Sequence, residues 1–81
     1  MNKNNRPALN VGKIYKVLES FQSWEQKHDG RPTSLIINDC AMYISDGGRF
    51  VPLRKFLYKT KIVVIPRHVD MDILTYMKEI D

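Results

Sequence analysis

Residues 61–65, Lys-Ile-Val-Val-Ile, constrain the fold more than any other part of the chain. The last four of them are apolar and β-branched, a composition that favours a buried β-strand, and Pro66 ends the run. Because Cys40 is the only cysteine, no internal disulfide can stabilise the fold, and 81 residues provide one modest core. The strand must therefore be covered by apolar side chains from the same small domain.

The N-terminal part of the chain has the apolar spacing of an amphipathic helix over residues 11–28. Apolar residues recur at steps of three and four at Val11, Ile14, Tyr15, Leu18, Phe21 and Trp24. Asn10 is a suitable N-cap, and Gly30, with Pro32 just beyond it, is a suitable end. We therefore expect a helix that packs on the core, although residues 14–17, Ile-Tyr-Lys-Val, also suit a strand.

The centre of the chain reads as short strands. Residues 34–38 form an apolar run typical of a buried strand, and an Asn38–Asp39 turn leads either to a second strand or to a short helix. Asp46, Gly47 and Gly48 provide a further turn into residues 49–51, which Pro52 restricts to an edge strand. The stretch between Pro52 and the buried strand is interpreted as a connection.

The two ends of the chain complete the expected fold. Residues 1–10 are rich in Asn and poor in apolar side chains, so we expect a flexible arm, with a single domain at 11–81. Residues 71–80 have helical apolar spacing, with Asp70 or Asp72 as the cap. The predicted class is α+β: an N-terminal amphipathic helix, a short antiparallel or mixed sheet of about three strands, and a C-terminal helix.

Composition also bears on the cellular location of the protein. It has no apolar run near the roughly 18 residues that span a bilayer, and its N-terminus lacks the apolar core of a signal peptide. Together with the single cysteine, this predicts a cytoplasmic protein that does not contact membranes.

Few residues suggest catalysis or metal binding. Cys40 could act with His28 or His68 as nucleophile and base, but no catalytic signature surrounds it, and a packed small apolar side chain is the usual alternative. The alternation His68, Asp70, Asp72 is compatible with a weak divalent metal site, but the capped start of a helix explains it better. The double glycine at 47–48 is not followed by a phosphate-loop lysine. We therefore predict no enzyme, no cofactor and no metal.

Residues 49–68 hold six basic residues and no carboxylate, although the whole chain has 13 basic and 9 acidic residues and a net charge of +4. The basic residues are Arg49, Arg54, Lys55, Lys59, Lys61 and Arg67. If residues 61–65 are buried, these side chains fall at strand ends and on the connection, where they can converge on one surface. A solvated face without a partner is the alternative. Trp24, expected to be half-exposed, is a further candidate contact.

Two functional hypotheses follow from these features. The first is a non-enzymatic module whose basic surface binds nucleic acid, or an acidic surface on a protein that handles nucleic acid, and that regulates or inhibits it. The second is an interaction protein that forms a homo-oligomer or a hetero-complex through a sheet edge near Phe50 or through the Trp24 face. No RNP, KH, zinc-knuckle or helix-turn-helix pattern occurs, so sequence-specific nucleic-acid recognition is unsupported.

Overall fold

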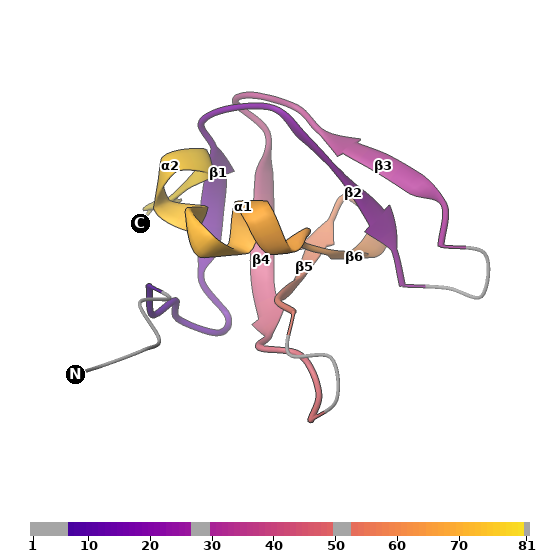
Figure 1. Cartoon of the computed structure of the whole chain (residues 1–81). Helices are drawn as coiled ribbons and strands as arrows, with labels where there is room; N and C mark the ends of the chain where they lie inside the picture. Colours follow the sequence, from indigo (N-terminus) through magenta and orange to yellow (C-terminus); the bar gives the residue numbers. More distant parts are fainter. Residues whose placement is uncertain (1–6, 27–29, 50–52, 81) are drawn as a thin grey trace.

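The computed structural model describes residues 7–26, 30–49 and 53–80, and within them it contains one antiparallel sheet of seven strands and two short helices (Figure 1). The strands are β1 (Ile14–Val17), β2 (Phe21–Glu25), β3 (Pro32–Leu35), β4 (Cys40–Ser45), β5 (Lys55–Tyr58), β6 (Lys61–Val64) and β7 (Met77–Ile80), and the helices are α1 (Arg67–Met71) and α2 (Ile73–Tyr76). The strands are ordered β3-β2-β6-β5-β4-β1-β7 across the sheet. The sheet curls, and α1 lies across one of its faces (Figure 1).

The predicted α+β class, with an N-terminal helix and about three strands, is therefore wrong. Residues 11–28 form no helix in their described part, because they contribute β1 and β2. Burial alternates along both strands, from Tyr15 and Val17 to Phe21, while Leu18 is 38% exposed and Trp24 is 37% exposed. The helical spacing was misleading because the apolar residues that produced it do not share one buried face.

The C-terminal prediction is half wrong. Helical residues end at Tyr76, and residues 77–80 form β7, which pairs with β1 along its whole length. The supposed connection after Pro52 contains another strand, β5, which pairs with β4 and β6. The predicted edge strand at 49–51 is described only at its first position, Arg49, because residues 50–52 lie outside the described residues. No helix in the described part of the chain is long and apolar enough to cross a membrane.

Two of the sequence-based expectations are correct. The turn before Asp39 exists, with Asn38 in the left-handed region at φ 77°, and it leads to strand β4 rather than to a helix. The run after Lys61 forms β6 inside the sheet, with Val63 and Ile65 fully buried, although Ile62 is 40% exposed, so the strand is buried only in its second half. The run at 34–38 is less buried than expected, because Leu35 alone among its apolar residues is buried.

The hydrophobic core lies between α1, α2 and the sheet face that they cover, which we call the inner face. Its centre is aromatic, because the ring of Tyr15 meets Tyr43 and Phe56 edge-on, with centroids 6.3 and 5.9 Å apart. Val69 of α1 and Ile73 of α2 are fully buried against this layer. The helices are short, and their buried apolar residues hold them in place.

Polar side chains also occupy inward positions. Glu25 is 4% exposed and forms an ion pair with Lys61 at 3.1 Å. The hydroxyl of Tyr58 donates a hydrogen bond of 2.5 Å to the carboxylate of Asp39. These two contacts offset the cost of desolvating Glu25 and Tyr58, whereas the buried hydroxyl of Tyr43 has no hydrogen-bond partner among the described residues.

The end of the expected N-terminal arm is attached to the sheet. Residues 1–6 are outside the described residues, but Leu9 packs against the core and the backbone N–H of Asn10 donates to the hydroxyl of Tyr15 at 2.8 Å. The side chain of Asn10 also donates to Glu79 on β7 at 2.8 Å. Residues 7–10 therefore extend the packed domain.

Alkaline unfolding should report on the buried tyrosine hydroxyls. Burial raises the pKa of Tyr58 above its ordinary value of 10.0, and the hydrogen bond to Asp39 acts in the same direction. The folded protein then holds this proton more tightly than the unfolded chain, so the stabilisation is complete below about pH 10 and is lost as the pH rises further. We expect the free energy of unfolding, measured by urea titration, to fall less steeply above about pH 10 in Tyr58→Phe.

The reference is the unmodified protein, titrated with urea at the same pH values. If the free energy of unfolding falls as steeply above about pH 10 in Tyr58→Phe as in the unmodified protein, the proton of Tyr58 does not contribute to the stability of the fold.

Candidate partner-binding face

The face of the sheet that points away from α1, the outer face, carries a continuous apolar row. Cross-strand pairing places Ile14 of β1 between Ile80 of β7 and Met42 of β4. The same pairing continues from Met42 to Leu57 of β5, and from Leu57 to Ile62 of β6. Directly paired side chains on one face lie close enough to touch. We call Ile80, Ile14, Met42, Leu57 and Ile62 the apolar row.

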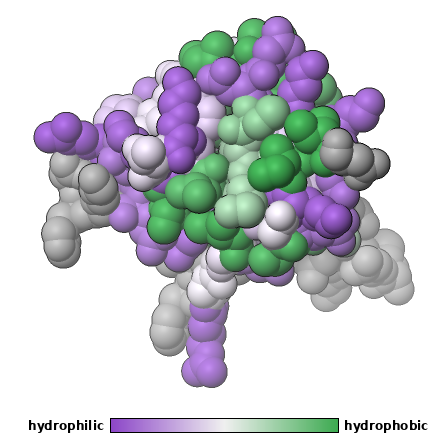
Figure 2. Space-filling view, turned by 180° about the vertical axis from the view of Figure 1, so that it is seen from behind, coloured by the Kyte–Doolittle hydropathy of each residue, from purple (hydrophilic) through white to green (hydrophobic). Residues whose placement is uncertain are grey.

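The apolar row is accessible to solvent. Ile14 is 37% exposed and Ile62 is 40% exposed, and the other members are partly exposed. Seen from behind, opposite to α1, the molecule has a central apolar area bordered by hydrophilic side chains (Figure 2). Contiguous apolar surface of this kind marks interaction sites more often than scattered exposed residues do.

Lysines border the apolar row. Lys16 of β1 and Lys78 of β7 form a direct cross-strand pair next to Ile14 and Ile80, and Lys55 of β5 points to the same side as Leu57. Lys59 lines a hollow of about 260 Å³ together with members of the row. Among the outward positions of the described strands, none holds an Asp or a Glu. The charged residues at the outward positions of the described strands are therefore all basic, while Lys59, in the turn after β5, lies 3.9 Å from the carboxylate of Asp39.

A second hollow, of about 360 Å³, lies at the other end of the outer face. It is lined by Trp24, Arg49 and Lys55, with Val64 of β6 in its wall. Register explains the arrangement, because Val64 pairs with Trp24 on one side and with Lys55 on the other. Three residues that the sequence marked as partner-binding candidates thus meet in one place.

The other predicted basic residues do not join them. Lys59 lies in the turn after β5, 5.3 Å from the centre of the Tyr58 ring, and Lys61 points inward to Glu25. Arg67 begins α1 and lines a different pocket. The six cations therefore do not converge, because the stretch that was interpreted as a connection alternates between the two faces of the sheet as β5 and β6.

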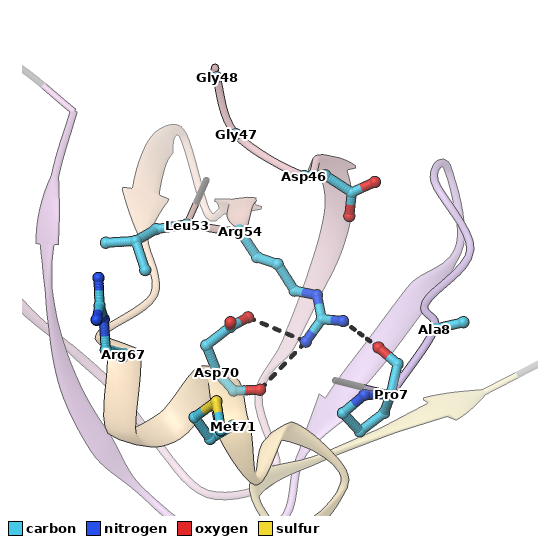
Figure 3. A pocket seen from close by; sticks show the side chains of 10 residues that line it. All are labelled: Pro7, Ala8, Asp46, Gly47, Gly48, Leu53, Arg54, Arg67, Asp70 and Met71. Carbon is cyan, nitrogen blue, oxygen red and sulfur yellow. Dashed lines mark hydrogen bonds and ion pairs between the residues drawn. The ribbon is translucent and has the colours of Figure 1, made fainter. Parts of the chain in front are cut away.

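Arg54 is the clearest correction, because it was expected at the surface and is 2% exposed. Its guanidinium donates to the carboxylate of Asp70 on α1 at 3.0 Å, and it also donates to the carbonyl of Pro7. The close view shows it reaching between these two groups (Figure 3). Arg54 therefore connects the sheet, α1 and the N-terminal segment.

The pocket beside Arg54 has a volume of about 720 Å³. Its wall includes Asp46 and the exposed Arg67, so charges of both signs line it (Figure 3). Since the guanidinium of Arg54 is already bound to Asp70, the pair is better suited to holding the fold together than to recognising a ligand.

No catalytic or metal-binding group emerges from the described residues. Cys40 was expected to be packed, but it is exposed and points outward on β4. His68 lies on α1, which covers the inner face, so Cys40 and His68 do not form a nucleophile–base pair, and His28 lies outside the described residues. No cluster of three or more His, Cys, Asp or Glu in the described ranges could hold a metal ion. The prediction that the protein is not an enzyme stays a prediction.

The apolar row, Lys16 and Lys78 were not predicted from the sequence. The signal was present in the short alternations at 14–17 and 77–80, which place an isoleucine and a lysine on one face if each stretch is a strand. The helical interpretation of both segments concealed it. The chain matches no protein-family model, no curated protein and no solved structure.

Arg54 and Lys55 are adjacent in sequence and opposite in role, which allows a matched test. Arg54→Leu leaves the carboxylate of Asp70 buried without its cation, so we expect the free energy of unfolding to fall by about 3–5 kcal/mol. Lys55→Leu removes an outward cation and should change it by less than about 0.5 kcal/mol. Urea denaturation at neutral pH measures both.

A double variant separates the loss of the ion pair from damage to packing. Replacing both partners, as Arg54→Met with Asp70→Leu, removes the uncompensated charge and should recover part of the loss. Equal stability of Arg54→Leu and Lys55→Leu would contradict the structural role of the buried pair.

Proposed function

We propose that the protein is a non-enzymatic binding module whose outer face holds an acidic, partly apolar segment of another protein. The observation that supports this most is the combination on one face of a continuous apolar row, a border of lysines and outward strand positions without a carboxylate. Either property alone is common on protein surfaces. Together they define the chemistry of the partner.

The apolar row would supply most of the affinity. Its side chains are partly exposed, and covering apolar surface contributes about 25 cal/mol for each Å² removed from water. The partner must therefore offer apolar side chains at the centre of the contact. A central apolar strip with a polar border is the usual anatomy of a protein–protein interface.

The lysines would select the partner by its charge. Lys16 and Lys78 lie side by side with no carboxylate facing them from the outward positions of β1, β4 or β7. Such a border accelerates association with acidic partners and disfavours basic ones. The long lysine stems can lie along the apolar row while the ammonium groups reach the partner.

Self-association through this face is the weaker alternative. Two copies packed by their outer faces would bring lysines together without carboxylates from those faces to balance them, which opposes a symmetric dimer. Association through a sheet edge stays a hypothesis. The described edges are β3 and β7, whereas Phe50, near which an interacting edge was expected, lies outside the described residues.

Synthetic peptides can test the proposed chemistry directly. The probe is a short peptide of alternating leucine and glutamate, with one control of alternating leucine and lysine and another of alternating serine and glutamate. In a titration followed by amide NMR, we expect the leucine–glutamate peptide to shift resonances of β1, β4 and β5 around Ile14, Met42 and Leu57. Both controls should bind more weakly, because each lacks one of the two properties.

Variants then locate the contact. Leu57→Thr keeps a strand-forming residue and removes apolar surface from the row, and Lys78→Glu reverses one border charge, so each should weaken the peptide several-fold. Arg67→Glu makes the same charge change on α1 and should leave binding nearly unchanged. Equal weakening by Lys78→Glu and Arg67→Glu would show that net charge, and not the outer face, controls binding.

A further inference from the structure

The hollow that contains Trp24 has features that the proposed protein contact does not use. Trp24 is on β2, points outward and is 37% exposed. Gly30 lies beside one edge of the ring, since a Cβ added there would lie 3.9 Å from Cδ1 of the indole. Part of the ring surface stays open to solvent.

The charges around the ring are of one sign. Arg49 and Lys55 line the same hollow, and none of the described residues that line it is an Asp or a Glu. Neither cation forms an ion pair with a described residue. A ligand that uses the whole hollow must therefore combine a flat ring with negative charge next to it.

We propose that this hollow binds one nucleotide unit of a single-stranded nucleic acid, with the base on the Trp24 ring and the adjoining phosphates at Arg49 and Lys55. Stacking on an aromatic ring beside basic side chains is the general mode by which proteins hold single strands. The site shares Lys55 with the border of the apolar row, but Trp24 and Arg49 do not belong to that contact, and the test of the site does not depend on that proposal.

A single strand fits better than a duplex or an acidic peptide. The bases of a duplex are stacked on one another and do not expose their faces to a ring on a strand. An acidic peptide would satisfy Arg49 and Lys55 but would gain little from the indole unless it also carried an aromatic side chain. The hollow has no basis for choosing among bases, because every base has a face that can stack.

Trp24 also makes the site directly observable, because it is the only tryptophan of the chain. The probe is an oligothymidylate of about ten nucleotides, and the control ligand is polyglutamate of similar charge. We expect the oligonucleotide to quench the Trp24 fluorescence with saturation, and the affinity to fall with salt by a log–log slope of about 0.7 per phosphate contacted. Polyglutamate should leave the fluorescence nearly unchanged.

Variants assign the contacts, with binding followed by the anisotropy of a labelled oligonucleotide. Trp24→Leu should lower the affinity by about 5- to 150-fold, the usual value of one stacked base, and Trp24→Phe should restore part of the loss. Lys55→Gln should reduce the salt slope by about 0.7. Lys78→Gln removes an outward lysine that does not line the hollow, and it should leave the slope unchanged.

Three results would overturn the inference: fluorescence that the oligonucleotide does not quench, quenching by polyglutamate to the same extent, or equal effects of Lys55→Gln and Lys78→Gln. None of them bears on the leucine–glutamate peptide, whose contact is measured at Ile14, Met42 and Leu57. Loss of binding in Trp24→Leu supports the inference only when Trp24→Leu and Trp24→Phe have the same stability in urea denaturation. The inference is contradicted if Trp24→Phe binds the oligonucleotide as weakly as Trp24→Leu does.

Discussion

The described helices cover only one face of the sheet, and the rest of the structure depends on this arrangement. Within the described residues, the helices are α1 with five residues and α2 with four, and both are buried against the inner face. A sheet must bury at least one face to be stable, and in the described part of the chain no helix covers the other face. Among the described residues, the side chains of the outer face are therefore accessible to solvent.

Covering the inner face required more than apolar contacts. The short helix α1 is attached to the sheet by Val69 in the core and by the ion pair of Asp70 with Arg54. The same arginine binds the carbonyl of Pro7, so one side chain joins three parts of the chain. Such a pair costs free energy to desolvate, and its clearest effect is to favour one arrangement of these parts over others.

Sequence reasoning recovered the elements whose signals are local. The β-branched run before Pro66 and the turn at Asn38 were predicted because their composition leaves few alternatives. The N-terminal strands could not be predicted in this way, since Ser23 and Glu25 occupy inward positions and hide the alternation of β2. Their burial depends on partners such as Lys61, which lies far away in the sequence.

The candidate site was also predicted only in part from the sequence. Trp24, Arg49 and Lys55 were identified from residue type and local charge, and the register of β2, β5 and β6 places Trp24 and Lys55 on either side of Val64, in the hollow that Arg49 also lines. The apolar row was not identified, because its members come from strands that span residues 14 to 80 and pair only in the folded sheet. Arg54 was predicted to lie at the surface because the local sequence does not show its ion pair with the buried Asp70 of α1.

The most direct measurement of the central claim is site-specific photo-cross-linking in cells that express the protein. A photoreactive amino acid at position 57 lies on the outer face, and one at position 74 replaces the exposed Leu74 of α2 on the opposite side. The account predicts cross-links from position 57 to a protein whose attached segment is acidic and partly apolar, and few or none from position 74. Cross-links from position 74 alone, or to the same partners from both positions, would contradict it.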